Sequence, residues 1–175
     1  AEAALAIGAN SLEVRTGAMY HDIGKLENPI FFTENQNGGI SPHSTLSPVE
    51  SAQNIIKHVT DGLALAEHEK LPKKIKEFIA THHGTSKVGY FYITYKNEHP
   101  NENVDESLFT YPGPKPTTKE QAVLMMADCL EAASHSLKEY SEENMARVKA
   151  LEDETDHYQD ALGSYLVKLS GAKMS

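Results

Sequence analysis

The sequence has one cysteine, an excess of acidic residues and no long apolar run, and each of these features excludes a class of protein. Cys129 has no partner for a disulfide within the chain, so a reducing compartment is the default expectation. No apolar stretch approaches the roughly 20 residues that a membrane-spanning helix needs, and no signal peptide is visible. The net charge of −9 disfavours a surface for polymeric nucleic acid or anionic lipid.

Strand-like alternation is also scarce, which predicts an all-α protein. The 175 residues and 39% hydrophobic content suit a single domain over residues 1–175. The chain begins with an Ala-rich segment, residues 1–8, that resembles the end of a helix. We therefore expect a soluble domain taken from a longer protein.

The clearest helix signals begin at Ser47. This residue is expected to be the N-cap, Pro48 fits the first helical position, and Glu50 completes a capping box. An apolar stripe follows at helical spacing, with a candidate break at Asp61-Gly62, and consists of Ala52, Ile55, Ile56, Val59, Leu63 and Ala66. A further helix is expected to open at Pro72 and to end before Gly84.

Other segments give weaker signals. We expect a helix over residues 11–26, whose residues about one turn apart are Leu12, Arg15, Met19 and Ile23. Another helix should start at Thr117 or Thr118, with an apolar face that consists of Val123, Met126, Ala127, Leu130 and Leu137. Residues 31–48 and 111–116 are rich in Gly, Pro and polar residues and should form ordered loops, and residues 89–106 are ambiguous. A last helix is expected at roughly residues 142–169.

Six imidazole and carboxylate side chains fall within or beside the apolar helices. Taken singly, a histidine on an apolar stripe is more often a hydrogen-bonded core residue than a ligand. Together, side chains from four helices should approach one core, and burying several of them is cheap only around cations. A set with no thiolate suits iron, manganese or zinc rather than calcium or magnesium. The candidate metal ligands are His21, Asp22, His58, His82, His83 and Asp128.

The order of these residues resembles the dinuclear subgroup of the HD-domain metal-dependent phosphohydrolases, whose signature "HDIGK" stands at residues 21–25. Longer runs resemble the cytoplasmic HD domain of the seven-transmembrane-helix HD-domain receptor family, most densely over residues 1–140. These runs are "YHDIGKLENPIFFTENQNGG", "PHSTLSP", "HHGTS" and "YPGPKPTTKEQAVLMMADCLEAA". The resemblance implies an HD-domain helical bundle with long ordered loops around a central metal site, in the cytoplasmic part of an inner or plasma membrane protein.

Characterised members of that family hydrolyse cyclic di-AMP to linear pApA, so the resemblance implies a phosphodiesterase. It implies that His21, His58 and His82 or His83 are terminal ligands of two divalent transition metals, iron or manganese. Asp22 would bridge the metals, and Asp128 would complete the shell of the first metal. A hydroxide activated by the metals would then attack phosphorus. A homodimer is one expected assembly.

Lys25 follows the HD pair by about one helical turn, so its ammonium group is expected to contact a substrate phosphate. Several polar residues are further candidates for substrate contact. Thr85 and Ser86 either donate hydrogen bonds to a phosphate or cap the turn after His83, and His43 either joins the pocket rim or caps the turn that follows it. The expected pocket rim consists of Asn35, Gln36, Tyr111 and Lys115.

Two departures from the family pattern stand out. The family has a further metal-binding histidine upstream of the HD pair, and residues 1–20 contain none. Beyond about residue 140 the sequence fits the pattern poorly, and His135 stands where the family leads us to expect Arg. Two other functions stay open at this point. One is a phosphohydrolase acting on mononucleotides, and the other is an HD domain that binds a messenger without hydrolysing it.

Overall fold

The computed structural model describes residues 1–36 and 41–138, apart from the side chains of residues 134–138. The chain divides into two compact units, residues 1–129 and 130–175. All the candidate ligands belong to the first unit, which alone is considered below. The helix expected at residues 142–169 and the side chain of His135 lie outside the described part, and the single domain over residues 1–175 stays a prediction.

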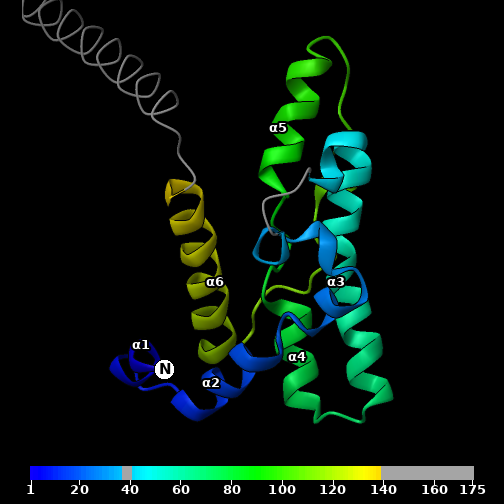
Figure 1. Ribbon diagram of the computed structural model, residues 1–175. Helices are drawn as coiled ribbons and strands as arrows, with labels where there is room; N and C mark the ends of the chain where they lie inside the picture. Colours follow the sequence, from blue (N-terminus) through cyan, green and yellow to red (C-terminus); the bar gives the residue numbers. More distant parts are fainter. Residues whose placement is uncertain (37–40, 139–175) are drawn as a thin grey trace, which may run out of the picture. The chain divides into compact units, whose positions relative to one another are not determined.

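Helices provide the regular structure of the described residues, which confirms the all-α expectation (Figure 1). The one β-pairing found there is an isolated bridge between Lys87 and Thr110. None of the described helices is both long and apolar enough to span a membrane. The α-helices are α1 (Glu2–Ala6), α2 (Ser11–Tyr20), α3 (Pro48–His68), α4 (Lys73–Thr81), α5 (Gly89–Glu98) and α6 (Lys119–Lys138). The short 3-10 turns are η1 (Ile23–Glu27), η2 (Pro29–Phe31), η3 (Thr33–Asn35), η4 (Pro42–Thr45) and η5 (Glu106–Phe109).

Helix α3 is the element against which α4, α5 and η1 pack. Its start is as predicted, because Ser47 and Glu50 form a reciprocal capping box and Pro48 occupies the first turn. The candidate break at Asp61-Gly62 is wrong, since the helix runs through it. Gly62 instead allows close packing, because a Cβ at this position would lie 3.1 Å from the side chain of Ile79 in α4.

Helix α2 is shorter than predicted, since it ends at Tyr20 and the chain continues in the 3-10 turn η1. The physical reason is the contact between η1 and α3. A Cβ on Gly24 would lie 1.9 Å from the carbonyl oxygen of His58, so only glycine lets the two backbones meet there. This contact brings the residues just after α2 onto α3.

The apolar faces predicted for the α2 and α6 segments are wrong in part, although Ile23 and Val123 do pack against buried clusters. Leu12 and Met19 are both 71% exposed, whereas Gly17 packs directly against the ring of Phe78. Met126 in α6 is likewise 65% exposed. The inward faces of α2 and α6 instead carry Val14, Gly17, Gln121 and Leu124.

The segments between helices are ordered turns. The predicted loop over residues 31–48 consists of short 3-10 turns where it is described, and residues 111–116 contain no helix. The ambiguous segment at residues 89–106 contains α5 and the start of η5. Thr118 caps α6 as expected, because its hydroxyl accepts a hydrogen bond from the backbone of Gln121 at 3.2 Å.

Candidate metal centre

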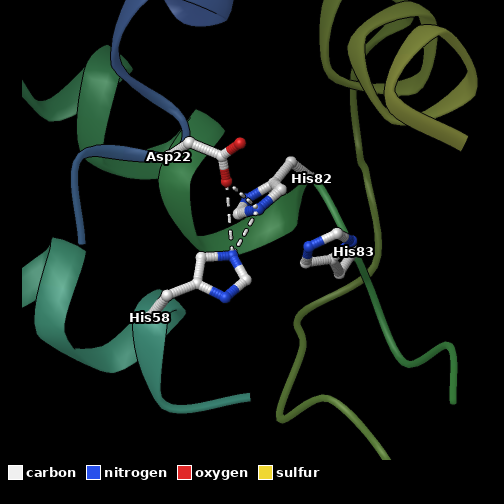
Figure 2. A group of neighbouring side chains, drawn as sticks. All are labelled: Asp22, His58, His82 and His83. Carbon is white, nitrogen blue, oxygen red and sulfur yellow. Dashed lines mark hydrogen bonds and ion pairs between the residues drawn. The ribbon is translucent and has the colours of Figure 1, made fainter. Parts of the chain in front are cut away.

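The six predicted ligands meet in one place. His21 and Asp22 follow α2, His58 lies in α3, His82 and His83 follow α4, and Asp128 lies in α6. They form two groups, in each of which one ligand atom per residue lies within 4.8 Å of the others. The first group is Asp22, His58, His82 and His83, which Figure 2 shows pointing toward one another, and the second is His21, Asp22 and Asp128.

Three of the histidines are oriented by the same backbone device. The Nδ1 atom of each ring lies within hydrogen-bond distance of the carbonyl oxygen three residues earlier. Such a bond makes Nδ1 the donor in the neutral ring, so Nε2 carries the free lone pair. The pairs are His21 with Ala18 at 3.0 Å, His58 with Ile55 at 2.6 Å and His82 with Ile79 at 2.8 Å.

As a result, two neutral imidazole rings bring unprotonated nitrogen atoms close together, which is an unfavourable contact. The Nε2 atoms of His58 and His82 lie 3.0 Å apart, with both Nδ1 protons already donated elsewhere. A proton between them is disfavoured, because burial lowers the pKa of His58 to about 4. Two lone pairs at this distance repel each other unless a cation lies between or beside them, so the donor set fits a metal ion.

Asp22 provides a second sign of a cation. Its Oδ1 atom is buried and has no hydrogen-bond partner in the described part of the chain, although it lies 3.4 Å from Nε2 of His58 and 3.5 Å from Nε2 of His82. Burial alone would raise the pKa of this carboxyl group, but His21 and Lys25 hold it well below its usual range. A buried carboxylate oxygen beside the lone pairs of two neutral imidazoles requires a positive partner.

In the second group, the His21 ring lies between the carboxylates of Asp22 and Asp128. Nε2 of His21 lies 3.2 Å from Oδ2 of Asp22 and 3.4 Å from Oδ1 of Asp128. Burial lowers the pKa of His21, but the two carboxylates outweigh this effect and raise it to about 10. His21 therefore carries a proton at neutral pH when no metal is bound. Metal binding at these residues would release that proton, as is usual for imidazole ligands.

Asp22 is the residue that the two groups share. Its Oδ1 atom faces His58 and His82, and its Oδ2 atom faces His21 and Lys25. A carboxylate whose two oxygens face separate ligand sets can hold a cation on each oxygen. The geometry thus agrees with the bridging role that the resemblance implies.

Lys25 lies directly beside the centre. Its Nζ atom is 2.9 Å from Asp22 Oδ2 and 2.7 Å from Glu34 Oε1, and it lies 5.1 Å from the centre of the Phe32 ring. Burial lowers the pKa of Lys25, but the Asp22 and Glu34 carboxylates raise it overall, so the side chain is charged. This position puts a fixed positive charge where a phosphate could approach the centre.

Two residues of this neighbourhood were not singled out from the sequence. Phe32 is 5% exposed and places its ring 5.7 Å from that of His58, nearly perpendicular to it. Glu34 is the ion-pair partner of Lys25. Both belong to the quoted "FFTENQ" run, but an apolar ring and one acid among 25 Asp and Glu residues carry no distinguishing pattern.

The predicted substrate residues occupy different positions. Asn35 and Lys115 are exposed, as expected of a pocket rim. Gln36 donates from its side chain to the carbonyl oxygen of Ile30 at 3.0 Å, so it also stabilises its own loop. Tyr111 departs from the expectation, since it is only 7% exposed and its ring stacks on that of His83 at 4.1 Å. Burial and the nearby acids raise the pKa of Tyr111, which keeps its hydroxyl protonated.

The remaining candidates lie in turns. The Nε2 atom of His43 lies 2.9 Å from the carbonyl oxygen of Phe31 and so connects η4 to η2. Thr85 and Ser86 lie in the turn after His83, where the backbone N–H of Ser86 donates to the carbonyl oxygen of His83. Their contact with substrate stays a prediction.

The comparisons with known proteins agree with this geometry. The HD domain family model matches residues 1–133. The cyclic-di-AMP phosphodiesterase PgpH of Bacillus subtilis (strain 168) is 42% identical over 143 residues, which are 82% of this chain and 20% of that protein. PgpH of Listeria monocytogenes is 42% identical over 147 residues, 84% of this chain and again 20% of the relative. The chain thus spans about a fifth of the length of these relatives.

Among solved structures, the chain is similar to the crystal structure of the L. monocytogenes PgpH HD domain in complex with cyclic di-AMP. The TM-score is 0.73 and the identity 39%, with 90% of this chain and 72% of that chain covered. The same HD domain in a second crystal structure gives a TM-score of 0.70. The family match over residues 1–133 and the converging His and Asp side chains lead to one conclusion: the chain belongs to the HD domain family.

Proposed function

We propose that this chain is the catalytic domain of a metal-dependent phosphodiesterase that hydrolyses a cyclic dinucleotide, with cyclic di-AMP as substrate and linear pApA as product. The observation that carries the proposal is the position of Asp22, whose two oxygens face two separate ligand groups. The names of the two PgpH relatives and the cyclic di-AMP complex of a similar HD domain support the choice of substrate.

The proposal assigns two divalent transition metals, iron or manganese, to these groups. His58, His82 and His83 would hold one ion with Asp22, and His21 and Asp128 would hold the other with the same aspartate. Bound there, such ions lower the pKa of a coordinated water and neutralise charge on a phosphoryl oxygen. An Asp22 bridge would fix the spacing of the pair.

The chain's own residues supply binding and orientation. The backbone hydrogen bonds at Nδ1 keep the rings of His21, His58 and His82 in place, so little reorganisation accompanies metal binding. Lys25, held between Asp22 and Glu34, would neutralise a non-bridging phosphate oxygen beside the metals. No side-chain nucleophile is required, because water is the attacking group.

The exposed residues Asn35 and Lys115 are proposed to contact the rest of the dinucleotide, together with Thr85 and Ser86. The relatives are about five times as long as the segment matched, and family resemblance supports a parent protein in the membrane with this domain in the cytoplasm. A homodimer stays a prediction.

The test is direct. Chain purified without chelator and reloaded with Mn²⁺ or Fe²⁺ is incubated with cyclic di-AMP, and the products are separated by chromatography. We expect pApA from the wild-type chain and none from Asp22→Ala. Asp61→Asn is the matched control, because this aspartate lies in α3 and its ion-pair partner there is Lys57. Binding without product would favour a messenger-binding domain, and turnover of mononucleotides alone would favour the other phosphohydrolase class.

A further inference from the structure

His83 is held differently from the other three histidines of the centre. His21, His58 and His82 each donate Nδ1–H to a backbone carbonyl oxygen. No backbone carbonyl in the described part of the chain accepts a hydrogen bond from the His83 ring, whose Nδ1 atom instead lies 3.4 Å from Oδ2 of Asp128. His83 lies beyond the end of α4, and the next residue, Gly84, has a φ of +53°, so the chain turns away there. Within the described residues, His83 therefore lacks the hydrogen bond from Nδ1 to a backbone carbonyl oxygen that orients the other three histidines.

The ring of Tyr111 lies against His83. The ring centroids are 4.1 Å apart and the planes differ by 24°, which is a stacked arrangement, whereas the other rings near Tyr111 or His83 meet at steeper angles. Stacked aromatic pairs contribute orientation as well as buried area. Tyr111 thus packs nearly parallel to the His83 ring.

Tyr111 is itself fixed in place. It is 7% exposed and packs with Ile56 and Val59 of α3. Its backbone N–H donates to the carbonyl oxygen of Ser86 at 2.9 Å, only three residues after His83. The Tyr111 ring is therefore attached both to α3, which carries His58, and to the turn that carries His83.

We propose that Tyr111 is a positioning residue for the metal centre, whose stacked ring holds His83 in place of the missing backbone hydrogen bond. The inference rests on the proposed function in one respect, since it takes His83 to be a metal ligand. It also reinterprets Tyr111, which the sequence placed at the pocket rim. Groups that orient a metal ligand typically change metal affinity by about 10- to 100-fold when they are removed.

The test measures metal binding and needs no substrate. The full chain is stripped of metal and titrated with Co²⁺, followed by visible absorption and by elemental analysis of the bound metal. Tyr111→Leu removes the ring, and we expect it to weaken the His83-containing site about tenfold. Tyr111→Phe keeps the ring and should bind Co²⁺ as the wild type does.

Two controls separate positioning from general loosening. Ile56→Ala cuts into the cluster that contains Tyr111 but leaves the stacked pair, so it should lower the urea midpoint without weakening Co²⁺ binding. In a His83→Ala background, Tyr111→Leu should have no further effect on Co²⁺ affinity. If Tyr111→Leu does not fold, as judged by circular dichroism, Tyr111→Met takes its place with the same criteria.

Each other outcome contradicts the proposal. Equal Co²⁺ affinities for Tyr111→Leu and the wild type would show that the ring does not hold His83. Equal weakening by Ile56→Ala, or an undiminished effect in the His83→Ala background, would show general loosening instead. A wild-type chain that binds no Co²⁺ would overturn the metal centre itself, and the cyclic di-AMP assay identifies that case separately.

Discussion

The Nε2 atoms of His58 and His82 lie 3.0 Å apart, while the Nδ1 atom of each ring is paired with a backbone carbonyl oxygen. Two helices thus hold two lone pairs against each other in the interior, at a cost in free energy. A cation bound there would be held by both Nε2 atoms and would remove this repulsion. A cation bound at this place would therefore stabilise the fold.

The first prediction concerns metal removal. Adding Mn²⁺ at 100 times its dissociation constant should raise the free energy of unfolding by about 2.7 kcal/mol for each ion bound, because the native state alone binds the ions. Thermal denaturation with Mn²⁺ and with EDTA measures this difference. His58→Asn should reduce the Mn²⁺ effect, because it removes a ligand from one of the two groups, whereas substitution of the exposed His68 should preserve the effect. A denaturation temperature that does not respond to Mn²⁺ contradicts the prediction.

The second prediction concerns Gly24. A methyl group at this position would meet backbone atoms of α3, His58 O at 1.9 Å and Gly62 N at 2.4 Å, and neither can move without displacing the helix. Gly24→Ala should therefore cost more than about 3 kcal/mol of stability or displace Asp22 enough to lose metal binding. Urea denaturation and metal analysis check both results.

The matched control for Gly24 is Gly89, where an added Cβ would meet nothing within 4 Å. Gly89→Ala should leave stability and metal content nearly unchanged. Similar behaviour of the two alanine variants would show that the close contact between η1 and α3 is not needed.

The third prediction concerns the pairing of Lys25 with Glu34. Glu34 is half exposed, so its loss should have a mild effect on stability, but the ammonium group that is proposed to contact phosphate would no longer be held in position. Glu34→Gln should raise KM about two- to fivefold, the range expected from an exposed ion pair, with a smaller effect on kcat. Steady-state kinetics with cyclic di-AMP measure both constants.

Glu67→Gln is the control for Glu34, because Glu67 pairs with Lys76 of α4 and not with Lys25. In a Lys25→Met background the Glu34 substitution should have no effect on KM. An equal effect on KM in the wild-type and Lys25→Met backgrounds would show that Glu34 does not act through Lys25.

The fourth prediction is an acid sensitivity of the metal-free chain. Burial lowers the pKa of His58 to about 4 and that of His83 to about 3, from an ordinary value of 6.5. As the pH falls below 6.5, the unfolded chain binds protons that the folded chain does not, so stability falls. His21 has the opposite shift, but its contribution changes between pH 6.5 and 10 and not below.

In EDTA, the free energy of unfolding should therefore fall as the pH is lowered from 6.5 to 4, by up to about 1.4 kcal/mol per pH unit and per histidine. The urea midpoint, measured across this pH range, should fall with it. Replacing His58 with Gln should reduce this slope, whereas replacing the exposed His68 should not. A slope that is the same in the wild type and in the His58 variant would contradict the prediction.

The helices with strong local signals could be predicted from the sequence. Capping chemistry at Ser47 and the apolar spacing after Pro72 act within a few residues, so α3 and α4 were identified correctly. The end of α2 could not be identified, because it depends on the approach of Gly24 to α3, a contact between segments far apart in the chain. The exposure of Leu12, Met19 and Met126 could not be predicted either, because it depends on how α2 and α6 pack against segments far away in the chain.

The candidate ligands were identifiable because histidine and aspartate beside apolar stripes are conspicuous. Their orientation was not, since it depends on backbone hydrogen bonds such as that from His58 to Ile55. The contacts of Tyr111 and Glu34 could not be predicted from the sequence. Stacking on His83 and pairing with Lys25 are contacts between distant segments or across a loop, and no local pattern encodes them.

The most direct measurement is the location of bound metal in a crystal of the Mn²⁺-loaded chain, by anomalous scattering. The account predicts two peaks about 3.5–4 Å apart, on either side of the Asp22 carboxylate, one near His58 and His82 and the other near His21 and Asp128. Asp22→Ala should remove at least one of them. An empty cluster in the loaded crystal, or manganese bound only away from Asp22, would contradict the account.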